Sequence, residues 1–180
     1  MPDTGRRATV QHKSHQSRDD ATANTPRTKE WPEVAFSSMS RQLYMDAVNE
    51  RVIVFDGAFG TFVQGLDLGP DDFGGAALEG CNEMLCLSRP DVIRRMHAAF
   101  LDVGVDALET ASFGSFSTVL NEYAIPEKAY DLNVAAARLA REVAADYETD
   151  GRTRFVAGSI GPGTKLPSLG HIRFAELRDA

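Results

Sequence analysis

The sequence lacks the features that mark several large classes of protein. Among its 180 residues there are only two cysteines, Cys81 and Cys86, too few for an extracellular disulfide framework, so we expect reduced thiols. No run approaches the ~18 to 20 consecutive apolar residues that a membrane-spanning helix needs. The N-terminus also lacks the apolar segment of a secretory signal. These absences predict a cytoplasmic protein.

Positive charge is scarce as well. Lys and Arg number 19 against 26 Asp and Glu, which gives a formal net charge of -7. Nucleic acid binding requires a clustered cationic surface, so we expect no nucleic acid partner. There is no GxGxxG or P-loop motif to support nucleotide binding. Cys81 and Cys86 do not have the CxxC spacing of a zinc knuckle, and we interpret them as core or loop thiols.

Aliphatic residues are almost absent from Met1 to about Glu33, where Ser, Thr, Asn, Gln, Arg and Asp predominate. Such a segment cannot bury enough apolar surface to offset its chain entropy. We therefore predict a disordered N-terminal tail over residues 1–39 and one folded domain over residues 40–180.

From Ser40 onward, helical and strand patterns alternate. The predicted helices cover 41–49 (capped by Ser40), 88–103, 116–147 with a break near Ile125-Pro126, and a last one from Phe174. The predicted strands are 51–55, 105–113 and 154–160. The continuously apolar run 51–55 is typical of a buried strand in a parallel sheet. This alternation predicts the α/β class with right-handed crossovers.

Two of these helices have a clear apolar face. For the first we predict Ser88 as the N-cap, Pro90 in the first turn and Gly104 as the C-cap. Its apolar stripe comprises Val92, Ile93, Met96, Phe100 and Val103. The stripe of the second comprises Leu132, Ala136, Leu139, Val143 and Tyr147. His97 has no partner at metal-ligand or triad spacing, and we interpret it as a surface or packing residue.

All three predicted strands end in polar, Gly-rich sequence: DGAFGT, ETASFGS and GSIGPGTKLPS. In α/β folds the working face lies at the carboxyl ends of the strands. Asp56 has two interpretations, as a turn cap or as a ligand-binding acid. The uncovered backbone at Gly57, Ala58 and Gly60 suits an anion, while Asp56 suits an ammonium group. An amino acid is therefore a natural ligand.

The other loop residues leave alternatives open. Glu109 lies within the second strand, where it could form a salt bridge inside a barrel or face a ligand at the mouth. Gly161, Pro162 and Gly163 could form a simple tight connection, with Lys165 as a solvated charge.

The ordered motifs DGAFGT, GCNEMLCLSRPDVIRRMHAAFLDVGVDALETASFGS and FVAGSIGPGTKLPSLGHI resemble the homocysteine S-methyltransferase family. Within it, the likeness is to the homocysteine-binding modules of cobalamin-dependent methionine synthases, from about Leu43 to Ala180. The GPGTKLPSLGH stretch favours this branch over those that use betaine or methylmethionine, which remain alternatives.

The resemblance implies a (β/α)8 barrel that binds homocysteine at its mouth and coordinates the thiolate to zinc. Coordination deprotonates a thiol whose ordinary pKa is ~8.5 while keeping it nucleophilic. It further implies methyl transfer from cobalamin, recharged by 5-methyltetrahydrofolate on separate modules. The substrate-binding residues that it implies are Asp56, Gly57, Ala58, Phe59, Gly60, Glu109 and Ser112.

Two departures from the family pattern affect this expectation. Ala111 replaces a residue that is commonly polar, a role that Ser112 could take over. The family's zinc cysteines correspond to positions beyond Ala180, so we expect neither a metal site nor a catalytic residue in this chain, and no activity from it alone. A (β/α)8 barrel takes ~250 residues. We therefore expect about three βα units of a truncated barrel, or else a non-catalytic, partner-binding fragment.

Overall fold

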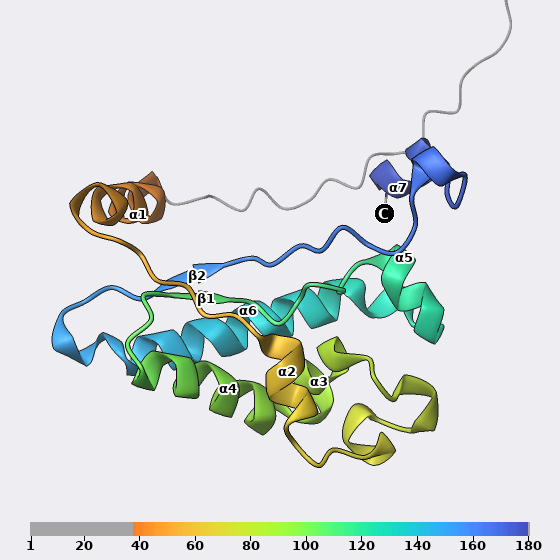
Figure 1. The fold of residues 1–180 in the computed structure, drawn as a ribbon, viewed down its shortest axis with the longest axis horizontal. Helices are drawn as coiled ribbons and strands as arrows, with labels where there is room; N and C mark the ends of the chain where they lie inside the picture. Colours follow the sequence, from red (N-terminus) through yellow and green to blue (C-terminus); the bar gives the residue numbers. More distant parts are fainter. Residues whose placement is uncertain (1–37, 180) are drawn as a thin grey trace, which may run out of the picture. The chain divides into compact units, whose positions relative to one another are not determined.

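The computed structural model describes residues 38–179, which form a parallel sheet with helices packed against it (Figure 1). Its α-helices are α1 (Ser38–Glu50), α2 (Phe59–Gln64), α3 (Leu85–Ser88), α4 (Pro90–Asp102), α5 (Ser117–Leu120), α6 (Ala129–Asp146) and α7 (Phe174–Asp179). Its strands are β1 (Ala107–Glu109) and β2 (Phe155–Ala157). No helix in this part of the chain is both long and apolar enough to cross a membrane.

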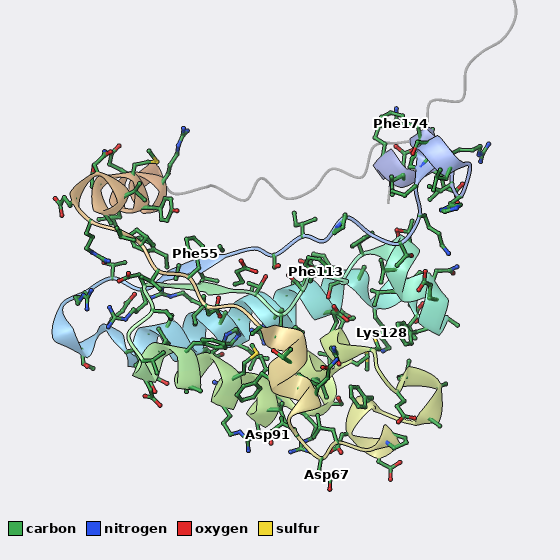
Figure 2. The ribbon with its side chains drawn as sticks, viewed as in Figure 1. Phe55, Asp67, Asp91, Phe113, Lys128 and Phe174 are labelled. Carbon is green, nitrogen blue, oxygen red and sulfur yellow. The ribbon has the colours of Figure 1, made fainter. Side chains whose placement is uncertain are left out.

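The sheet is parallel, as the sequence predicts. Strand β1 pairs with β2 in the register Ala107 to Phe155 and Glu109 to Ala157. On its other side, Ala107 forms a parallel bridge with Phe55 (Figure 2), and the Asp56 N–H donates to the Ala107 carbonyl oxygen over 3.0 Å. Three segments that are consecutive in the sequence therefore lie side by side, and the α/β class is confirmed.

The predicted strands are longer than the observed ones. The segment 51–55 forms a single bridge rather than a strand, and regular pairing covers three residues in each of β1 and β2. The expected burial of 51–55 is also wrong, since Val52 is 82% exposed and Val54 50%. Continuous burial needs cover on both faces of a sheet. Here α4 and α6 lie on the same side of the sheet (Figure 1), and Val52, Val54 and Phe55 stay in contact with solvent.

Helices α4 and α6 bury most of the apolar faces that their sequences predict, while Phe100 and Tyr147 are only partly buried. Val92, Ile93 and Met96 of α4 are buried. The buried residues of α6 are Leu132, Ala136, Leu139, Ala140, Val143 and Ala144. Val103 is a correction, because it follows the last residue of α4 and is 81% exposed. The break predicted near Ile125-Pro126 is confirmed by a 3-10 turn at Pro126–Lys128 that separates α5 from α6.

The ends of α4 agree only in part with the predicted caps. Ser88 is not the N-cap, because it ends the short helix α3 and its hydroxyl donates to the Met84 carbonyl oxygen. Pro90 does occupy the first turn. The C-cap is Val103 and not Gly104. Gly104 is the next residue, with a left-handed φ of 95°, and its N–H donates to the Leu101 carbonyl oxygen.

Two further differences concern the N-terminal region. Helix α1 begins at Ser38 rather than after Ser40, so Ser40 does not cap it. The predicted tail otherwise falls on residues 1–37, outside the described residues. Helix α2 and the 3-10 turns Pro70–Phe73, Ala76–Leu78 and Asn82–Met84 were not predicted. These elements are too short to show apolar periodicity.

A buried carboxylate joins the amino ends of the first two segments of the sheet. Asp106 Oδ2 accepts a hydrogen bond from the Val54 N–H over 3.0 Å, and Oδ1 lies 2.6 Å from Arg51 Nη1. Burial by itself would raise the pKa of Asp106, but the Val54 N–H and the Arg51 guanidinium outweigh it and lower that pKa overall. These contacts hold the first segment against the residue that precedes β1.

Candidate functional site

A cavity of about 290 Å³ opens where the carboxyl ends of the three segments meet. Asp56 follows the first segment, Glu109 ends β1, and Ser159 follows β2 by two residues. The lining residues are Asp56, Gly57, Ala58, Phe59, Gly60, Asn82, Glu83, Met96, Glu109, Thr110, Ala111, Phe113 and Ser159. The structure thus brings together six of the seven predicted substrate-binding residues.

Asp56 is the most constrained acid at this cavity. Its side chain is only 4% exposed, and its Oδ1 accepts a hydrogen bond from the Glu109 N–H over 2.7 Å. Its Oδ2 lies 3.7 Å from Nδ1 of the fully buried His97 on α4. Asp56 therefore joins the first segment, β1 and α4 at the floor of the cavity.

Glu109 has a different environment. It is exposed, and its Oε2 accepts a hydrogen bond from the Ser159 hydroxyl over 3.2 Å. Its backbone N–H is held by Asp56, so the position of its Cα is fixed while its carboxylate remains accessible. Glu109 thus lines the cavity with an accessible carboxylate.

The loop between the first segment and α2 presents backbone rather than side chains. A Cβ added at Gly57 or Gly60 would meet no atom within 4 Å, so the space beside both residues is open. Ala58 is the N-cap of α2 and adopts a left-handed conformation with φ of 55°. The first N–H groups of a helix have no acceptor within the helix and point outward from its N-terminal end. Together these features leave backbone donors beside the cavity.

Ser112 is the predicted site residue that does not line the cavity. It is buried, and its Oγ lies 2.6 Å from Thr110 Oγ1 and 2.9 Å from the Ser159 carbonyl oxygen. The Ser159 N–H in turn donates to Thr110 Oγ1 over 3.0 Å. These bonds tie the loop after β1 to the loop after β2. In the structure, Ser112 supports the wall of the cavity.

Sequence reasoning missed Glu83, which brings a third carboxylate to the cavity. It lies in the 3-10 turn Asn82–Met84, and its Oε1 accepts a hydrogen bond from the Gly114 N–H over 2.8 Å. This turn precedes α3 rather than following a strand, so strand-end reasoning could not find it. With Asp56, Glu83 and Glu109, and with no Lys or Arg among the lining residues, the cavity suits a ligand that carries a positive group.

The loop after β2 packs on aromatic rings through two glycines. The Gly161 N–H donates to the Phe113 carbonyl oxygen over 2.9 Å, and Phe113 lies in the loop after β1 (Figure 2). Gly163 is left-handed with φ of 71°, and a Cβ there would come within 2.9 Å of the Phe116 ring. Lys165 lies 3.3 Å from the Glu122 carboxylate in a partly exposed ion pair.

The cysteines do not form a metal centre. Burial, followed by the nearby charge of Glu83, raises the pKa of Cys81 to about 11 and that of Cys86 to about 12. Cys86 Sγ donates to the Ala111 carbonyl oxygen over 3.5 Å. Residues 38–179 contain no group of three or more His, Cys, Asp or Glu side chains that could hold a metal ion. The donors described therefore do not fit a zinc site.

Comparison with known proteins identifies the family. The family model for homocysteine S-methyltransferases matches residues 53–180, and the chain belongs to this family. It is 46% identical over 136 residues to a methionine synthase of Mycobacterium tuberculosis and 44% identical over 136 residues to one of Mycobacterium leprae. Each match covers 76% of this chain and 11% of the relative, so the chain spans about a tenth of the length of these relatives.

Solved structures show a related fold. The homocysteine methyltransferase MmuM from Escherichia coli, in its metallated form, matches with a TM-score of 0.55 and 21% identity over 67% of this chain and 41% of that one. The oxidized form matches with a TM-score of 0.54 over 66% of this chain and 40% of that one. The likeness supports the parallel arrangement described above.

Proposed function

We propose that this chain supplies the homocysteine-binding part of a methionine synthase, which transfers a methyl group to the homocysteine sulfur. The observation that carries the proposal is the acidic cavity with open backbone at Gly57 and Gly60, in a chain 46% identical to a methionine synthase. The resemblance of GPGTKLPSLGH to the cobalamin-dependent branch supports methylcobalamin as the methyl donor, with 5-methyltetrahydrofolate as its source.

The binding mode follows from the charges at the cavity. The ammonium group of homocysteine lies against the accessible carboxylate of Glu109, because opposite charges attract strongly where water is partly excluded. The buried carboxylate of Asp56 adds negative charge behind Glu109 and holds its backbone N–H. Its carboxylate accepts hydrogen bonds from backbone N–H groups within the loop 57–60. Phe59 contributes wall surface, and Ser112 supports Thr110 and Ser159.

The same comparisons support a larger architecture. Three consecutive segments pair in sequence order, as the first strands of a (β/α)8 barrel do. We assign residues 38–180, which are the predicted domain with the first two residues of helix α1 added, to part of a homocysteine-binding barrel domain. Because the described donors do not fit zinc, we assign this part of the chain to substrate binding and not to thiol activation. We expect no methyl transfer from these 180 residues alone.

Glu109→Gln tests the proposed binding mode. It removes the exposed charge while keeping the shape of the side chain. Hydrogen bonds to charged groups contribute about 1.5 to 3 kcal/mol, so the affinity for L-homocysteine should fall on the order of 10- to 100-fold. Isothermal titration calorimetry of the 180-residue chain gives this affinity.

The matched control is Glu142→Gln, which neutralises an exposed acid of α6 that pairs with Arg94 away from the cavity. It should leave the affinity unchanged. A second control ligand, 4-sulfanylbutanoate, lacks the ammonium group and should bind wild type and Glu109→Gln equally. Equal homocysteine affinity for wild type and Glu109→Gln would contradict the proposed mode.

A further inference from the structure

His97 and Asp56 form an isolated buried pair below the cavity. His97 is 0% exposed, and neither of its ring nitrogens has a hydrogen-bond partner among the described residues. Buried polar groups without partners cost free energy and are uncommon, so such a group calls for a physical explanation. The Asp56 carboxylate faces it, with 3.7 Å between Asp56 Oδ2 and His97 Nδ1.

The two oxygens of Asp56 face different partners. Oδ1 accepts from the Glu109 N–H over 2.7 Å, whereas Oδ2 faces the imidazole. A neutral imidazole carries one N–H, and its position on Nδ1 or Nε2 is set by the surroundings. A carboxylate can only accept, so an imidazole that faces it through Nδ1 should carry its proton on that atom.

The position of the imidazole is set by the packing of α4. Val92, Ile93 and Met96 of this helix are buried, which fixes its rotation and places the next residue, His97, beneath Asp56. Met96 itself lines the cavity. Two consecutive residues of α4 thus act at the site, one on its wall and one under its floor.

We infer that His97 is a positioning residue, which orients the Asp56 carboxylate and through it fixes Glu109 at the rim of the cavity. The sequence gives His97 no partner, and the contact arises only from the fold. Turning the Asp56 carboxylate toward the cavity would break the Glu109 N–H bond and leave His97 without its facing charge. His97 therefore holds the Asp56 carboxylate in its orientation while the Glu109 carboxylate contacts the ligand. Its effect on homocysteine rests on the proposed function, whereas its effect on the Glu109 backbone does not.

The test needs no ligand in its first step. Long-range ¹H–¹⁵N spectra of the wild-type 180-residue chain report which nitrogen of His97 is protonated. Asp56→Asn assigns the signal, because this change should shift it. The inference predicts a proton on Nδ1. A neutral His97 protonated on Nε2 alone would overturn it, and this measurement remains decisive where a His97 variant fails to fold.

Variants form the second step. His97→Leu removes both nitrogens, and His97→Asn keeps an amide donor near the place of Nδ1. The Leu variant should speed hydrogen exchange of the Glu109 amide about 10-fold or more, as expected when its acceptor is no longer held. It should weaken L-homocysteine binding by a similar factor, and His97→Asn should restore most of both.

Leu101→Ala is the matched control, because Leu101 is another buried residue of α4 and its cluster lies away from the cavity. It should lower the free energy of unfolding without changing the hydrogen-exchange rate of the Glu109 amide relative to those of neighbouring amides. Equal effects of Leu101→Ala and His97→Leu, or wild-type values in His97→Leu, would overturn the inference. If wild type fails to bind homocysteine while the Glu109 amide responds to His97→Leu alone, the positioning role stands and the proposed function fails.

Discussion

At the scale of single residues, the carboxylates around the cavity differ in role because they differ in burial. The side chain of Asp56 is nearly inaccessible, and one of its oxygens accepts a hydrogen bond from the Glu109 N–H. Asp56 therefore holds the backbone beside the cavity in place. Glu109 is exposed and contacts only a hydroxyl among the bonds described for its side chain, so it can meet a ligand's ammonium group. Buried acids are retained where partners offset their desolvation, and exposed acids keep their reactivity toward ligands.

The two cysteines should be inert in the folded chain. With pKa values of about 11 and 12 instead of the ordinary 9.0, their thiolate fractions at pH 8 fall on the order of 100-fold or more. Alkylation by iodoacetamide should be slower by at least this factor than for a free thiol, and should become fast in urea. Labelling of the folded chain at the rate of a free thiol would contradict this prediction.

These thiols also link stability to pH. Their pKa values are raised in the folded state, so folding favours the protonated form. The stabilisation is fully present below the unfolded-state pKa and is lost as pH rises through the folded-state values. Denaturant midpoints should therefore decline between about pH 9 and pH 11, and Cys86→Ala should reduce the decline.

At the scale of elements, the connections after the strands are held by close approach of backbone and aromatic rings. A Cβ at Gly161 would lie 2.6 Å from the Phe113 carbonyl oxygen and 2.7 Å from its ring, so even Ala cannot fit without movement. The GPG stretch is therefore a tight connection, one of the interpretations that the sequence allowed, and it packs against Phe113, which lines the cavity.

Gly161→Ala should lower the free energy of unfolding by about 1 to 3 kcal/mol, because overpacking displaces Phe113 and the loop after β1. Gly158→Ala is the matched control, since a Cβ there meets nothing within 4 Å, and it should change stability by less than about 0.5 kcal/mol. Urea denaturation measures both. Equal free energies of unfolding for the two variants would contradict the prediction that a Cβ at position 161 displaces Phe113.

How far the sequence predicts these elements depends on their length. Helices α4 and α6 carry enough residues for an apolar stripe, and both were predicted close to their observed limits. The prediction of Ser88 as the N-cap of α4 was wrong because a serine can either begin one helix or end another. Here Ser88 is the last residue of α3, which ends just before α4 begins. The sequence did not predict helix α2, or that Glu83 lines the cavity, because both depend on packing between distant segments.

At the scale of the molecule, the site combines parts that are distant in the sequence. Asp56 and Glu109 meet because parallel strands bring their carboxyl ends to one edge. The turn Asn82–Met84 adds Glu83, and α4 places His97 against Asp56. The sequence analysis predicted six of the thirteen lining residues, but it could not show that the side chain of Asp56 is buried or that His97 faces it. Those facts arise from three-dimensional packing and leave no local signal in the sequence.

The measurement that tests the central claim most directly is a ¹H–¹⁵N NMR titration of the chain with L-homocysteine. The account predicts that the largest amide shifts fall on residues 57–60 and Glu109, which border the cavity. Amides near Asp106, at the opposite end of the strands, should stay unchanged. Shifts centred on Tyr44 and Val48, which line a separate hollow beside α1, or no shifts at high ligand concentration, would contradict it.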